Sequence, residues 1–118
     1  MIQRLFYSVF FIVCIISCGQ KTVDLQDFDE SAWQADKDGC DGARTKMRDT
    51  LIKVKSELKA LNGDQIIAVL GKPNKTNLAD RNQKYFIYNI SCPTQTGEHS
   101  TLSIRFSAIG LSYEVLVY

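Results

Sequence analysis

The chain has 118 residues, which is the size of one domain with at most a short extension. Its 14 basic and 13 acidic residues nearly cancel, and this balance argues against a nucleic-acid-binding protein, which would carry a basic surplus. A chain of this size buries only a modest core, so a covalent cross-link would add usefully to its stability.

The first 17 residues predict a cleavable signal peptide rather than part of the fold. Arg4 provides a positive start and an apolar run over residues 5–16 follows it. That run is shorter than the roughly 20 residues that a membrane-spanning helix needs. An uncleaved N-terminal anchor is the alternative, but the small residue Ser17 favours cleavage.

The end of this segment indicates where the protein resides. Ile15-Ile16-Ser17-Cys18 resembles the lipobox of bacterial lipoproteins, in which an aliphatic residue, a tolerant position and a small residue precede a cysteine. The resemblance implies cleavage before Cys18, a diacylglyceryl thioether on its sulfur and acylation of its new amine. Two or three acyl chains would hold the protein firmly on a membrane. Gly19 replaces the aspartate that retains Gram-negative lipoproteins at the inner membrane, which favours the outer membrane, on its periplasmic or its surface side.

Residues 18–30 are polar and predict a lipidated tether, followed by a single α+β domain over residues 31–118. Phe28 and Trp33 are exceptions to the polar character of this part of the chain. We expect both to pack on the domain, and a binding role for Trp33 is the alternative.

Two helices are predicted next. The first is long, from about residue 41 to residue 60, because its apolar residues recur at helical spacing on one face: Cys40, Met47, Leu51, Val54, Leu58 and Leu61. The second is short, over residues 65–70, with Asp64 as its cap and Gly71 as its end. The acidic residues before the long helix and the basic residues along it predict a solvated surface, with a contact to an acidic partner or to lipid headgroups as the alternative.

Three strands are predicted after a polar loop at residues 74–83. They cover residues 84–90, 101–107 and 111–118, and their short links predict an antiparallel β-meander. In the last strand, one face is expected to carry Tyr113, Val115 and Val117, and the other Glu114, Leu116 and Tyr118. The expected fold is therefore α+β, with one long and one short helix packed on a three-stranded antiparallel sheet.

The face of the sheet that the helices leave open is the expected contact surface, because large aromatic and apolar side chains remain on it. Together with Trp33, the candidate contact residues for a partner are Tyr85, Tyr88, Leu116 and Tyr118.

The cysteines predict one disulfide. Cys14 leaves with the signal peptide and Cys18 takes the lipid, so Cys40 and Cys92 remain as a pair in a compartment where disulfides persist. Two buried free thiols are the alternative.

No residue pattern supports catalysis or a cofactor. His99 is the single histidine and no nucleophile pattern accompanies it. The spacing of Cys40, Cys92 and His99 matches no standard zinc motif. We therefore predict that the protein is not an enzyme and binds neither a metal nor another cofactor.

The second half of the chain resembles a known family. Leu70-Gly71-Lys72-Pro73, followed later by a strand with Ile104 and Phe106 and by Gly110, is similar to the small helix-and-meander lipoproteins of the BamE/SmpA type. The long first helix and the predicted disulfide depart from that family. The resemblance implies a non-enzymatic cell-envelope lipoprotein that binds or scaffolds another envelope protein, in outer-membrane assembly or maintenance. The alternative is a periplasmic module that binds a small ligand or acts as an inhibitor.

Overall fold

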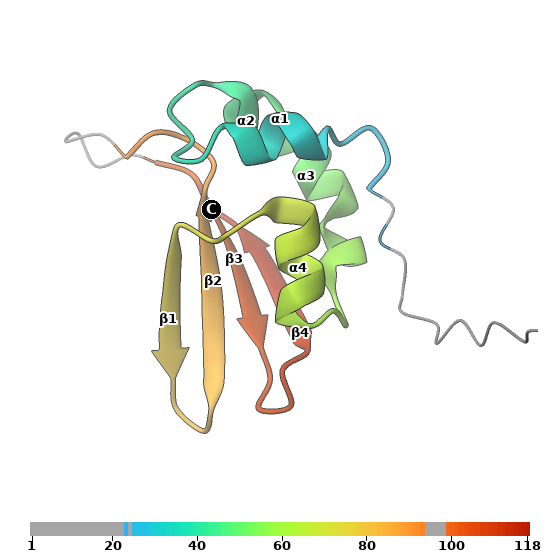
Figure 1. Cartoon of the computed structure of the whole chain (residues 1–118), viewed down its shortest axis with the longest axis vertical. Helices are drawn as coiled ribbons and strands as arrows, with labels where there is room; N and C mark the ends of the chain where they lie inside the picture. The colour runs from blue at the N-terminus through green and yellow to red at the C-terminus, as the bar shows by residue number, and fades with distance from the viewer. Residues whose placement is uncertain (1–22, 24, 94–98) are drawn as a thin grey trace, which may run out of the picture.

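The computed structural model describes residue 23 and residues 25–93 and 99–118. Over these residues the chain forms one four-stranded antiparallel sheet with short helices on one side of it (Figure 1). The α+β class is therefore as predicted. The predicted signal peptide and the predicted lipid site Cys18 lie outside the described residues.

The sheet has one strand more than the sequence predicted. Its strands are β1 (Lys75–Ala79), β2 (Gln83–Asn89), β3 (Thr101–Phe106) and β4 (Ser112–Val117), and they lie side by side in chain order. β1 falls in the segment predicted as a polar loop. It pairs with β2 along its whole length, but its side chains are almost all exposed. An edge strand of this kind needs only backbone hydrogen bonds, so its sequence shows no alternation of apolar and polar residues from which it could be predicted.

The single long helix was a wrong prediction. The structure has α1 (Glu30–Ala35), α2 (Ala43–Lys46), α3 (Arg48–Val54), the 3-10 helix η1 (Lys55–Leu58) and α4 (Gly63–Leu70). The predicted segment is interrupted at Met47, where φ is −89° and ψ is −1°, and its last turn tightens into η1. Leu51, Leu58 and Leu61 of the predicted stripe are nevertheless fully buried, because the broken segment still turns one side toward the sheet.

The core lies between the helices and the inner face of the sheet. It includes Leu25, Phe28, Trp33, Leu51, Leu58, Leu61, Ile66, Val69, Leu70, Phe86, Tyr88, Ile90, Leu102, Ile104, Phe106 and Val115. Leu25 and Phe28 belong to the segment predicted as a tether, so the packed part of the chain includes residues before position 31. Among the described residues, no helix combines the length and the apolar character needed to cross a membrane.

A β-bulge changes which side chains of β4 face outward. Arg105 pairs with Glu114 whereas Phe106 pairs with Ser112, so Tyr113 is an extra residue in β4. Tyr113 therefore lies on the outer face of the sheet, where its ring contacts Arg105. The prediction that Tyr113 shares the inner face with Val115 was wrong, because strict alternation fails at a bulge.

Candidate functional site

The outer face of the sheet carries an aromatic–arginine cluster, formed by Gln83, Tyr85, Arg105 and Tyr113. The guanidinium carbon of Arg105 lies 5.4 Å from the ring centre of Tyr85 and 5.3 Å from that of Tyr113. The Oε1 atom of Gln83 accepts hydrogen bonds from Nε and Nη2 of Arg105 and from the hydroxyl of Tyr113. These contacts hold Arg105 in one orientation at the surface, and tyrosine and arginine are the residues that most often dominate protein interfaces.

Three of the predicted contact residues are accessible. Tyr85 is half-buried in the cluster, Leu116 lies on the same outer face at 36% exposure, and Tyr118 follows at the exposed end of the chain. Leu116 is paired with Ser103 of β3 across the sheet. The structure therefore places Tyr85 and Leu116 on one continuous face, together with Arg105 and Tyr113, which the sequence did not single out.

Trp33 and Tyr88 are not available for contact, because both are fully buried. The ring of Trp33 packs against the rings of Phe28 and Tyr88, with distances between ring centres of 5.4 Å and 6.4 Å. Tyr88 lies on the inner face of β2 and its hydroxyl donates to the carbonyl of Gly71. Burial raises the pKa of Tyr88, so this hydroxyl keeps its proton. The alternation of Phe86, Tyr88 and Ile90 is the sequence signal that would have placed Tyr88 inside.

Arg44 is an important residue that the sequence did not distinguish from its exposed neighbours. It is 1% exposed and joins α2 to three other parts of the fold: α1, the link before β1, and β2. Its Nε donates to the carbonyl of Trp33 at 2.9 Å, and its Nη1 donates to Asn74 and to the carbonyl of Asn89 at 3.0 Å each. Its guanidinium carbon lies 4.6 Å from the centre of the Trp33 ring. A buried cation is tolerated only with such compensation.

Asp36 stabilises the turn that leads into α2 through hydrogen bonds to backbone N–H groups. Its carboxylate accepts from the backbone N–H groups of Asp41 at 2.9 Å and of Arg44 at 3.0 Å. Burial raises the pKa of Asp36, but these backbone hydrogen bonds and the positive charge of Arg44 outweigh burial and lower the pKa below its ordinary value. Asp36 therefore acts as a buried acceptor for the turn that leads into α2.

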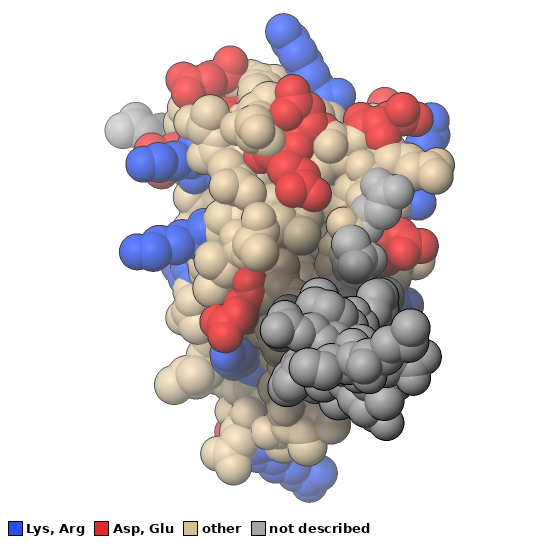
Figure 2. Space-filling model, turned by 45° about the vertical axis from the view of Figure 1, so that its right-hand side comes forward, with Lys and Arg blue, Asp and Glu red and all other residues tan. Residues whose placement is uncertain are grey.

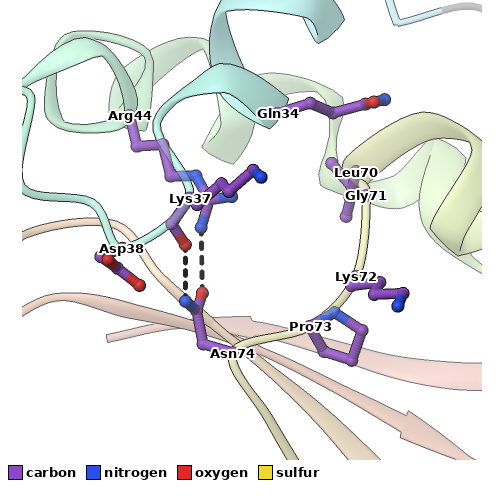
Figure 3. A pocket seen from close by; sticks show the side chains of 9 residues that line it. All are labelled: Gln34, Lys37, Asp38, Arg44, Leu70, Gly71, Lys72, Pro73 and Asn74. Carbon is purple, nitrogen blue, oxygen red and sulfur yellow. Dashed lines mark hydrogen bonds between the residues drawn. The ribbon is translucent and has the colours of Figure 1, made fainter.

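A cavity of about 460 Å³ lies beside Arg44 (Figure 3). Its lining comes from the end of α1, from Arg44 and from the link between α4 and β1: Gln34, Lys37, Asp38, Arg44, Leu70, Gly71, Lys72, Pro73 and Asn74. The lining holds three cations and one carboxylate. The amide of Asn74 lies between two of these residues, because it accepts from Arg44 and donates to the carbonyl of Lys37 at 2.6 Å.

Figure 2 shows Asp and Glu side chains at the surface toward the upper end of the molecule, the end that α1 and α2 occupy in Figure 1. Of the described acidic residues that precede α2, Asp27, Asp29, Glu30, Asp38 and Asp41 are at least partly exposed, whereas Asp36 is buried. Most of this charge therefore faces solvent.

Cys40 and Cys92 form a disulfide with an S–S distance of 2.10 Å, so this prediction is confirmed. The bond joins the loop before α2 to the segment that follows β2. His99 is exposed, and in the described part of the chain no group of three or more His, Cys, Asp or Glu side chains is placed to hold a metal ion.

In comparisons with known proteins, no protein-family model, no curated protein and no solved structure matches this chain.

Proposed function

We propose that this protein is a non-enzymatic, lipid-anchored lipoprotein of the bacterial cell envelope that binds another envelope protein through the outer face of its sheet. The observation that carries the proposal is the aromatic–arginine cluster. Arg105 is held between Tyr85 and Tyr113 on a face that the described helices leave open, and Leu116 extends the apolar area beside it.

The anchor follows from the lipobox resemblance at residues 15–18. A lipid on Cys18 would keep the domain close to a membrane and would raise its effective concentration for partners in that membrane. The outer membrane, and a role in its assembly or maintenance, is the setting that Gly19 and the resemblance to lipoproteins of the BamE/SmpA type favour.

Partner binding is tested by photo-crosslinking in intact envelopes. A photoreactive residue at position 116 is expected to capture a defined envelope protein, and a second one at position 52 is the matched control. Leu116 and Ile52 are both exposed aliphatic residues, at 36% and 39%, but Ile52 lies on the helical side. Equal capture from both positions, or capture that survives Arg105→Ala without loss, would contradict the assignment of the outer face.

The loss expected for Arg105→Ala follows from the cluster. Truncating an arginine that is a hot spot of an interface costs about 2 kcal/mol or more, which corresponds to a roughly thirtyfold weaker complex. Arg81→Ala, in the exposed turn between β1 and β2, provides a charge-matched control and is expected to leave binding unchanged.

The anchor is tested separately. Cys18→Ala is expected to move the protein from the membrane fraction to the soluble fraction, because the variant has no sulfur that could carry the diacylglyceryl group. Retention of this variant in membranes would refute the lipid anchor without affecting the assignment of the outer face.

A further inference from the structure

The cavity of Figure 3 contains hydrogen-bond donors that the described residues leave without acceptors. Arginine has five N–H bonds. Three of those on Arg44 reach protein oxygens, through Nε and Nη1, and no acceptor in the described part of the chain binds the other two, on Nη2. Among these residues the one fully enclosed side-chain polar atom that lacks a partner is Nε1 of Trp33. Nη2 of Arg44 is therefore not fully enclosed, although Arg44 as a whole is only 1% exposed, and Arg44 lines the cavity.

Arg44 is held rigidly in this position. Its packing on the Trp33 ring and its hydrogen bond to Asn74 fix the plane of the guanidinium, and Asn74 is itself fixed by its hydrogen bond to Lys37. A donor that is already oriented and desolvated binds an anion at a lower entropic cost than a mobile surface side chain does.

Helix capping does not account for these free donors. α1 and α4 both end at the cavity, and the carbonyl groups at helix ends need donors. The Nε of Arg44 supplies the carbonyl of Trp33 in α1, and the amide of Gln34 supplies the carbonyls of Ala68 and Val69 in α4, at 3.2 and 2.9 Å. None of these hydrogen bonds to helix ends uses Nη2 of Arg44 or the ammonium groups of Lys37 and Lys72, which also line the cavity.

The lysines add positive charge to the same cavity. Lys37 and Lys72 line it, and within the described residues neither forms an ion pair with a carboxylate. In Figure 3 the side chain of Lys37 extends beside the guanidinium of Arg44, above Asn74. Asp38 is the single carboxylate of the lining, so the cavity keeps an excess of positive charge.

We propose that this cavity binds a small oxyanion, the carboxylate or phosphate group of a ligand, through Nη2 of Arg44 and Nζ of Lys37. The volume of about 460 Å³ exceeds that of the anionic group alone, and Pro73, which is partly exposed, supplies apolar surface for a short carbon body. The site is separate from the outer face, so this proposal stands independently of partner binding.

The test is a titration of the full chain in a neutral detergent at low ionic strength, with inorganic phosphate and, separately, with acetate as probes. Binding is followed by the arginine Nε–Hε and backbone N–H signals in NMR spectra. We expect saturable shifts at Arg44 and around the cavity. Lys37→Gln, which changes an exposed side chain, is expected to weaken binding about tenfold or more, the loss typical of one charge-assisted hydrogen bond.

Lys75→Gln is the matched control, because Lys75 is exposed on β1 near the cavity but does not line it. It is expected to bind both probes as the parent protein does. Absence of saturable shifts with both free probes and with the lipid-doped micelles of the second arm would overturn the proposal. Equal weakening by the two substitutions would also overturn it.

A second arm distinguishes the source of the oxyanion. The parent protein and Lys37→Gln are compared in neutral micelles doped with phosphatidylglycerol. Any contribution of the N-terminal segment to micelle binding is the same for both proteins, because the two differ only at position 37. A Lys37-dependent shift with the doped micelles but not with free phosphate assigns the site to a lipid headgroup. A shift with free phosphate or acetate alone assigns it to a soluble ligand.

Discussion

Ser112 joins the helical layer to β4, and its loss should be costly for so small a change. The side chain is 3% exposed. Its hydroxyl donates to the carbonyl of Leu58 at 2.6 Å and accepts from the backbone N–H of Leu61 at 3.0 Å. Ser112→Ala removes one oxygen atom, so it leaves almost no cavity but deprives two backbone groups of the partner they have in the structure.

The magnitude follows from those two groups. A buried donor or acceptor without a partner costs about 1–3 kcal/mol, so the free energy of unfolding should fall by roughly 3 kcal/mol. For a domain of this size, 1 kcal/mol corresponds to about 4–8 °C in Tm, so Tm should fall by well over 10 °C.

Urea denaturation of the two purified variants measures the effect, with Ser103→Ala as the matched control. Ser103 lies on the neighbouring strand at 8% exposure, and its hydroxyl makes no hydrogen bond with the described residues. Ser103→Ala thus removes the same hydroxyl oxygen from a similarly buried position, but it leaves no backbone group without its hydrogen-bond partner. If Ser112→Ala and Ser103→Ala lose stability equally, the assigned role of the Ser112 hydroxyl is wrong.

Three further predictions concern the region before α2 and the disulfide that holds it. Replacing both Cys40 and Cys92 by serine should lower the free energy of unfolding by about 4 kcal/mol, because the bond spans 52 positions, and urea titration with and without reductant measures this. Gly39→Ala should cost more than Gly42→Ala in thermal unfolding: both glycines have positive φ, but a Cβ on Gly39 would meet backbone atoms of β2 and its following turn at 3.0–3.1 Å, whereas a Cβ on Gly42 would meet nothing within 4 Å. Asp36 has a lowered pKa when folded, so its stabilising effect is present above the ordinary value of about 4 and is lost as pH falls through the folded pKa. Asp36→Asn should therefore flatten the acid side of a stability–pH series, and an unchanged slope would contradict this assignment.

The parts of the fold that the sequence predicted correctly are those with an apolar period or a simple chemical count. Leu51, Leu58 and Leu61 are buried as their helical spacing predicted, although the helix that carries them is broken. The disulfide followed from pairing the two cysteines that remain once the predicted signal peptide and the predicted lipid site are set aside. The helical spacing is a local pattern and the disulfide follows from a count of cysteines, so neither prediction needs knowledge of the tertiary structure.

The features that the sequence missed depend on tertiary contacts. β1 is held by backbone pairing with β2, and the bulge at Tyr113 depends on the register between β3 and β4. Arg44 stands in a basic stretch, and only the packing of α1 and β2 around it makes it a buried residue. The cavity was missed for the same reason, since its lining joins segments far apart in the chain.

The acceptors of Arg44 also determine where this protein can change during evolution. Two of its three hydrogen bonds end on backbone carbonyls, those of Trp33 and Asn89, which every amino acid provides. Position 89 can therefore vary without loss of this bond, whereas Arg44 and the side chain of Asn74 cannot be replaced by most other residues. Among related sequences, we expect an arginine and an asparagine separated by 30 positions to persist together while position 89 varies.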